Sequence, residues 1–221
     1  MTLNNLKSVQ KLLGILVMLF SFSMLFPFLV SGMDLDINTA SAFLASFVFT
    51  LLAGIILWLP SRAAATDIRL HEGFIIVAFF WIILALFGAI PFLMLPQSAL
   101  SITDAIFEST SGLTTTGATV MNNLDSLPKG LLFYRAQLQW LGGLGIVVLA
   151  VAIMPLLGVG GMQLYKADSA SSVRDSKLNP RQKETAKSLG KIYLVLTFSC
   201  ILSFWAAGME LFDAICHGLT T

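Results

Sequence analysis

Charged side chains are scarce in this sequence. Asp, Glu, Lys and Arg make up only 11% of its 221 residues, whereas 57% are hydrophobic. This balance excludes an ordinary soluble domain and indicates a protein surrounded largely by membrane lipid. A nucleic-acid partner is not expected, because the formal net charge of +1 creates no global field for a polyanion.

Cysteine and histidine are also rare, with two residues of each. Cys200 and Cys216 lie in apolar sequence without metal-ligand spacing, so we interpret both as packing residues rather than as parts of a disulfide framework. His71 and His217 are far apart and lack clustered partners, which favours a structural role for each. No nucleophile–base pair stands out, so the sequence predicts no catalytic residue and no enzyme.

Long apolar segments take up most of the chain. The first follows Lys7 and Lys11, but it is longer than the core of a signal peptide and no small-x-small cleavage site follows it. We therefore interpret it as a retained helix. Five segments reach the ~20 residues that a membrane-spanning helix needs, at about 11–30, 39–59, 73–95, 131–157 and 189–207. The expected fold is an all-α, polytopic membrane protein.

Basic residues indicate how these segments are oriented. Eleven of the 13 Lys and Arg residues would lie on one side of the membrane, and only Lys129 and Arg135 fall toward the other. The positive-inside rule then places the N-terminus and the 158–188 loop in the cytoplasm. The seven basic residues from Lys166 to Lys191 have two interpretations, the positive-inside rule alone or a docking face for a cytosolic partner.

A polar stretch without basic residues, Phe107–Thr119, lies between two apolar segments. It starts as a helix near Ser101 and breaks at Gly112, so its ~12 helical residues are too few to span a membrane. Thr115–Gly117 can then hold an extended backbone whose carbonyls replace the hydration shell of a monovalent cation. The stretch predicts a re-entrant pore loop that enters from outside, and a polar surface loop is the alternative.

The two acidic residues of the short helix each have a candidate partner. Asp104 is near the start of the helix, where Ser101 or Thr103 would share in capping it. Glu108 would be costly at membrane depth without a partner, and Arg135 is the nearest candidate by topology. Snorkelling of Arg135 to the outer interface is an equally good interpretation.

A short repeat indicates a second unit of the same kind. Asp104-Ala-Ile106 recurs as Asp213-Ala-Ile215, in each case after a long apolar segment. By this offset the second filter would fall beyond Thr221, so we expect it to be missing from this chain. Between the two copies, three glycines would allow close packing against the pore helix or a neighbouring unit, namely Gly142, Gly143 and Gly145.

Three stretches resemble the Trk/Ktr/HKT superfamily of potassium transporters. Residues 107–119 are similar to its first pore loop, and 139–146 and 152–165 are similar to bacterial TrkH-type ion-conducting subunits in particular. This resemblance implies a potassium-channel-like fold, in which helix–pore loop–helix units surround one pore. It also implies a filter whose backbone carbonyls coordinate potassium, formed by Thr115, Thr116 and Gly117 and flanked by Thr114 and Ala118.

The same resemblance implies a cellular setting. The chain would take part in potassium uptake as a multi-pass protein of the bacterial inner (plasma) membrane, with the potassium ion as its expected cofactor. The full-length form would be a homodimer that binds the cytosolic nucleotide-binding regulatory subunit of the Trk system. A truncated, non-conducting fragment that interacts with intact subunits is the alternative. Proton coupling, sodium coupling and passive conduction all stay open.

Four parts are expected along the chain. Residues 1–72 would form two leading transmembrane helices, and 73–157 would form the first helix–pore loop–helix unit with its filter at 113–119. Residues 158–188 would form the cytoplasmic basic loop. Residues 189–221 would begin a second unit that stops before its own filter.

Overall fold

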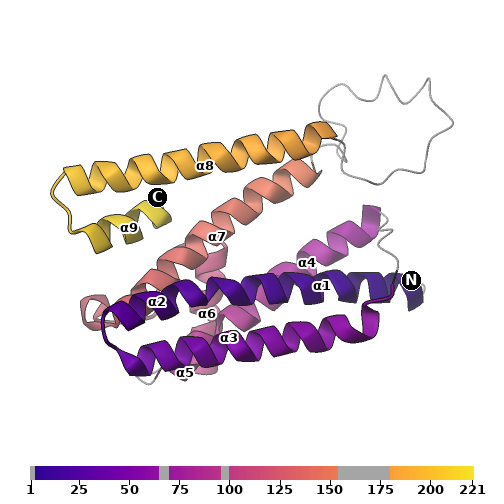
Figure 1. Cartoon of the computed structure of the whole chain (residues 1–221), viewed down its shortest axis with the longest axis horizontal. Coiled ribbons are helices and arrows are strands. Elements are labelled where there is room, and N and C mark those ends of the chain that lie inside the picture. Colours follow the sequence, from indigo (N-terminus) through magenta and orange to yellow (C-terminus); the bar gives the residue numbers. More distant parts are fainter. Residues whose placement is uncertain (1–2, 65–69, 96–99, 154–179) are drawn as a thin grey trace.

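Helices form all the regular structure in the part of the chain that the computed structural model describes, residues 3–64, 70–95, 100–153 and 180–221 (Figure 1). The α-helices are α1 Leu3–Ser23, α2 Leu25–Met33, α3 Ile37–Trp58, α4 Leu70–Gly88, α5 Ile90–Met94, α6 Ile102–Leu113, α7 Lys129–Ile153, α8 Pro180–Ala206 and α9 Leu211–Thr220. Two short 3-10 helices are η1 Leu59–Ser61 and η3 Leu124–Ser126. The predicted all-α fold is confirmed for these residues.

Four stretches of the described residues are long and apolar enough to cross a membrane, Leu6–Met33, Ile37–Ser61, Ile75–Met94 and Glu184–Ala206. They correspond to the first, second, third and fifth expected segments. At the fourth, α7 is a helix of 25 residues, about 37 Å long at 1.5 Å per residue. The expected continuation of α7 to residue 157, and residues 158–179 of the basic loop, lie outside the described residues.

The leading helices form a close antiparallel pair, in which α1 and α3 lie side by side (Figure 1). Their backbones approach at two glycines. A Cβ at Gly14 would lie 2.8 Å from the backbone nitrogen of Trp58, and a Cβ at Gly54 would lie 2.9 Å from that of Met18. The two helices therefore pack backbone to backbone, as small residues allow in membrane proteins.

The turn between α2 and α3 is closed by a helix cap. Asp36 is the N-cap of α3, and its carboxylate accepts hydrogen bonds from the hydroxyl and the backbone N–H of Thr39. These bonds hold the pKa of Asp36 below its usual value, because they favour the ionised form. The bond from the Thr39 hydroxyl makes the largest contribution. The cap ties the chain reversal to the start of α3.

An aromatic cluster forms the centre of the core. The rings of Phe43 on α3 and Phe92 on α5 lie 5.3 and 5.4 Å from the ring of Tyr134 on α7, and all three side chains are fully buried. The Tyr134 hydroxyl donates a hydrogen bond to the carbonyl of Gly88 at the end of α4. These contacts fix α7 against the leading helices, and α6 packs on α7 and α4 in the middle of the group (Figure 1).

Basic residues are distributed unequally between the two ends of the helix group. The start of α1, the end of α3 and the start of α8 lie at the same end (Figure 1). These segments carry the basic residues Lys7, Lys11, Arg62, Arg181, Lys183, Lys187 and Lys191. The Lys11 ammonium donates to the Ala64 carbonyl at 2.9 Å there. At the other end, Lys129 at the start of α7 forms a 3.2 Å ion pair with Asp34.

Candidate functional site

The short helix α6 carries the candidate site at its C-terminal end. It has 12 residues, about 18 Å at 1.5 Å per residue, which is well short of the ~30 Å of hydrocarbon in a bilayer. Its start is closed by a capping box, in which Ser101 and Asp104 each bond the backbone N–H of the other. The capping role expected for Asp104 is thereby confirmed, with Ser101 as its partner.

The chain leaves α6 through a left-handed turn. Thr115 has φ +57° and Gly117 has φ +72°, so the extended backbone expected over Thr115–Gly117 is interrupted. The N–H of Thr115 donates to Gly112, and those of Thr116 and Gly117 donate to Ser111. These bonds satisfy carbonyls that the end of a helix leaves without partners, and they explain why the turn forms here.

The backbone carbonyls of this loop fall into two groups. All residues from Thr114 to Val120 are exposed in this chain. Within the described residues, no hydrogen bond donor contacts the carbonyl oxygens of Thr115, Thr116 or Gly117. By contrast, the carbonyl of Ala118 accepts a hydrogen bond of 2.7 Å from the Ser111 hydroxyl. The first three carbonyls are free to bind a ligand, whereas that of Ala118 is turned back toward α6.

Threonine hydroxyls in the loop bind one another or the helix. The Thr114 hydroxyl lies 2.8 Å from the Thr110 carbonyl and 2.9 Å from the Thr116 hydroxyl. The hydroxyls of Thr114 and Thr116 are therefore occupied within the protein. The backbone oxygens of Thr115, Thr116 and Gly117 stay available for a cation. The negative end of the α6 dipole also favours a cation there.

Glycines of α7 make room for the helices around it. A Cβ at Gly142 would overlap the carbonyl oxygen of Leu113, at the end of α6. A Cβ at Gly143 would meet the Tyr193 hydroxyl at 2.6 Å, and one at Gly145 would meet the Trp81 ring at 3.4 Å. The interpretation of these glycines as packing positions for the pore helix and its neighbours is thereby confirmed.

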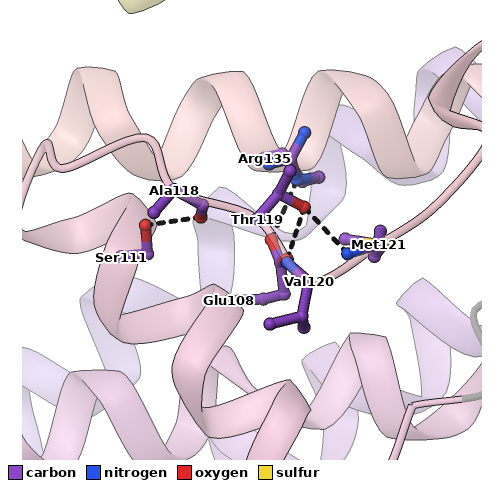
Figure 2. Close-up of polar contacts among 7 residues, drawn as sticks. All are labelled: Glu108, Ser111, Ala118, Thr119, Val120, Met121 and Arg135. Carbon is purple, nitrogen blue, oxygen red and sulfur yellow. Dashed lines mark hydrogen bonds and ion pairs between the residues drawn. The ribbon is translucent and has the colours of Figure 1, made fainter.

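Glu108 and Arg135 form an ion pair behind the loop (Figure 2). The Arg135 Nε atom lies 3.1 Å from Glu108 Oε2, and the two side chains are 14% and 1% exposed. The predicted pair is confirmed, and pairing rather than snorkelling accounts for Arg135. Sequence reasoning missed two further donors to Glu108, the Thr119 hydroxyl and the Val120 backbone N–H. Neither spacing nor composition signals these contacts.

The second copy of the short repeat also lies on a short helix. Asp213-Ala-Ile215 is in the first half of α9, which follows α8 and packs beside α7 and α8. Ala105 of α6 and Ala214 of α9, at matching positions in the two copies, are both completely buried. Equivalent placement after a long helix and against α7 supports the interpretation of α9 as the start of a second unit.

Histidine and cysteine do not cluster among the described side chains. His217 lies on α9 with its ring 6.0 Å from that of Phe204, while the side chain of His71 is outside the described part. Cys200 and Cys216 are free thiols. No group of three or more His, Cys, Asp or Glu side chains that could hold a metal occurs among the residues described.

A short capped helix that ends in an exposed loop, set among apolar helices of spanning length, is typical of a polytopic membrane protein. Residues 39–221 match the family model of TrkH, described as a cation transport protein. The chain belongs to the TrkH family.

Similar proteins agree with this assignment. The chain is 50% identical over 217 residues to the Trk system potassium uptake protein TrkH of Halomonas elongata, covering 98% of this chain and 45% of the relative. It is 50% identical over 215 residues to that of Escherichia coli K12, covering 97% and 44%. The crystal structure of the potassium transporter TrkH from Vibrio parahaemolyticus superposes with a TM-score of 0.84 at 45% identity, covering 97% and 42%. The chain thus spans less than half the length of these relatives.

Proposed function

We propose that this chain takes part in potassium uptake across the bacterial inner membrane and contributes the first filter strand of a four-unit pore. The carbonyl oxygens of Thr115, Thr116 and Gly117 are the proposed ligands, and Thr114 and Ala118 flank them. Potassium is the transported substrate in this proposal rather than a resident cofactor. The single observation that carries it is the set of three exposed carbonyls without a donor among the described residues.

The geometry of α6 favours a cation at these carbonyls. The N–H groups of residues 115–117 are all directed back to the last turn of the helix, so they do not present positive charge to the pore. The C-terminal end of the helix dipole adds partial negative charge at the same place. A ring of such carbonyls replaces the hydration shell of a potassium ion, as in channel filters.

A chimera tests the proposed function directly. This chain is joined to the remaining C-terminal part of the Escherichia coli relative and expressed in cells that lack their own potassium uptake systems. We expect growth at low potassium and rubidium uptake that potassium inhibits more strongly than sodium does. The intact relative serves as the positive control. A chimera that reaches the membrane at normal level but takes up no rubidium would contradict the proposal.

The proposed orientation places the basic end of the helix group in the cytoplasm. Lys7, Lys11 and Arg62 lie at that end, and a cytosolic nucleotide-binding regulatory subunit would dock there in the full-length homodimer. This follows from the positive-inside rule, since loops rich in Lys and Arg stay on the cytoplasmic side. Lys129 and Arg135 then lie toward the outside, together with the entrance to the proposed filter.

Cysteine labelling checks this orientation. In a background with Cys200 and Cys216 replaced, Ala63→Cys and Asn122→Cys introduce single thiols at exposed positions near opposite ends of the helix group. We expect an impermeant maleimide added to intact cells to label Asn122→Cys and not Ala63→Cys. After the membrane is permeabilised, both should react, which confirms that each site is accessible. Labelling of Ala63→Cys alone in intact cells would reverse the proposed topology.

A further inference from the structure

The buried carboxylate of Glu108 connects α7 to the residues that follow the proposed filter. Its Oε2 atom pairs with Arg135 of α7, and its Oε1 atom accepts from the Thr119 hydroxyl and from the Val120 N–H at 2.7 Å (Figure 2). A buried charge is costly unless several donors compensate it. Here two of the three donors come from the loop, so the charge holds the loop as well as the helices.

Ser111 makes a second connection one turn further along α6. Its hydroxyl donates to the Ala118 carbonyl at 2.7 Å, and the Thr119 hydroxyl accepts from the Met121 N–H at 3.1 Å (Figure 2). Glu108 and Ser111 are three residues apart, so they lie on one face of the helix. Together they hold four successive residues of the loop, 118–121, directly or through Thr119.

Little room is left behind Gly117. Glu108, Ser111, Arg135 and Gln139 enclose with Gly117 a space too small to hold a water molecule. The Gln139 amide oxygen lies 3.5 Å from where a Cβ at Gly117 would stand. The loop therefore cannot move back toward α7 without displacing these side chains, because protein interiors at this density transmit rather than absorb a shift.

We infer that Glu108, Ser111 and Arg135, which we call the loop anchor, are positioning residues that set the ion selectivity of the filter. This inference rests on the proposed function. Residues 115–117 are held by α6 on one side and by the loop anchor on the other, so their three carbonyls have little freedom to close around a smaller ion. Sodium needs shorter ion–oxygen distances than potassium, and ligands fixed at the longer distance bind it less well.

Two isosteric variants of the chimera test the loop anchor, and one neighbour is a matched control. Ser111→Ala removes only the bond to Ala118, and Thr119→Val removes the bonds to Glu108 and Met121 while the exposed side chain keeps its shape. Ser109→Ala is the control, because Ser109 is also buried on α6 but its hydroxyl has no hydrogen bond partner among the described residues. Rubidium uptake is measured against competing potassium and sodium, and thermal unfolding is measured in detergent.

We expect Ser111→Ala to lower the preference for potassium over sodium by about fivefold, as expected for the loss of one hydrogen bond. Thr119→Val loses two hydrogen bonds, so it should lower the preference at least as much. Ser109→Ala should leave this ratio unchanged. A merely structural role would lower protein level or melting temperature with the ion preference intact, and that result in both variants would overturn the inference while the proposed function stands. An unmutated chimera without selective uptake would overturn both.

Discussion

Gly117→Ser should abolish the preference for potassium over sodium in the chimera while the protein still inserts in the membrane. Gly117 has φ +72°, a left-handed conformation that costs a residue with a Cβ roughly 1–2 kcal/mol. A Cβ by itself would meet no clash, because the nearest atom would be 3.5 Å away, so the backbone conformation is the main obstacle. A serine would therefore relieve backbone strain by rotating the peptide, and this rotation would turn the neighbouring carbonyls away from the ion. Competition between potassium and sodium for rubidium uptake measures the change.

Gly208→Ser provides the matched control for this experiment. Gly208 also has a positive φ, +97°, and nothing lies within 4 Å of an added Cβ. It connects α8 and α9 and is not part of the 114–120 loop. We expect it to lose similar stability and to keep its ion preference. Thr115→Ala and Thr116→Ala should also change the preference less than Gly117→Ser does. The carbonyl mechanism would be wrong if Thr116→Ala abolished selectivity and Gly117→Ser did not.

Arg135→Met should destabilise the protein by roughly 3–5 kcal/mol, because it leaves the carboxylate of Glu108 buried without its cation. The double variant Glu108→Gln/Arg135→Met should recover part of this loss, since the second change removes the uncompensated charge. The two residues are in contact at 3.1 Å, so their effects should not add. Unfolding of the 221-residue chain in detergent, followed by circular dichroism, gives the free energies for this double-mutant cycle.

An exposed ion pair of the same chain is the control. Lys129 and Asp34 form a pair of similar length, 3.2 Å, but their side chains are 47% and 41% exposed. Lys129→Met should therefore cost at most about 1 kcal/mol, as is typical of a solvent-screened pair. If the losses of unfolding free energy from Glu108→Gln and Arg135→Met were strictly additive, the two side chains would not stabilise each other. The ion pair would then not contribute to the loop anchor.

Local features of the sequence predicted most of the fold. The apolar segments, the capping of α6 by Ser101 and Asp104 and the packing role of Gly142 all depend on residues near one another or on composition alone. The length of an apolar segment and the capping of a helix are local properties, so both can be predicted without the tertiary structure. The pairing of Glu108 with Arg135 could be proposed because few other partners exist at membrane depth. The sequence could not predict the distance between the two side chains or the additional bonds from the loop.

The path of the loop differs from the expected one. An extended backbone was expected at Thr115, but the structure has a left-handed turn there. The turn forms because carbonyls in the last turn of α6 accept hydrogen bonds from the N–H groups that follow. Ala118 was expected as a flanking ligand, but Ser111 binds its carbonyl. Contacts of Glu108 with Thr119 and Val120 arise only when the loop folds back along α6.

The sequence by itself determined that this protein is a helical membrane protein with a short polar helix and a threonine–glycine loop, because hydrophobicity and helix signals act over a few residues. Only the tertiary structure decided which carbonyls of that loop are free. That outcome depends on hydrogen bonds between residues 7 to 27 positions apart, from Ser111–Ala118 to Glu108–Arg135. The contact of Glu108 with Arg135 forms only after α6 and α7 have packed together, so no local pattern encodes it.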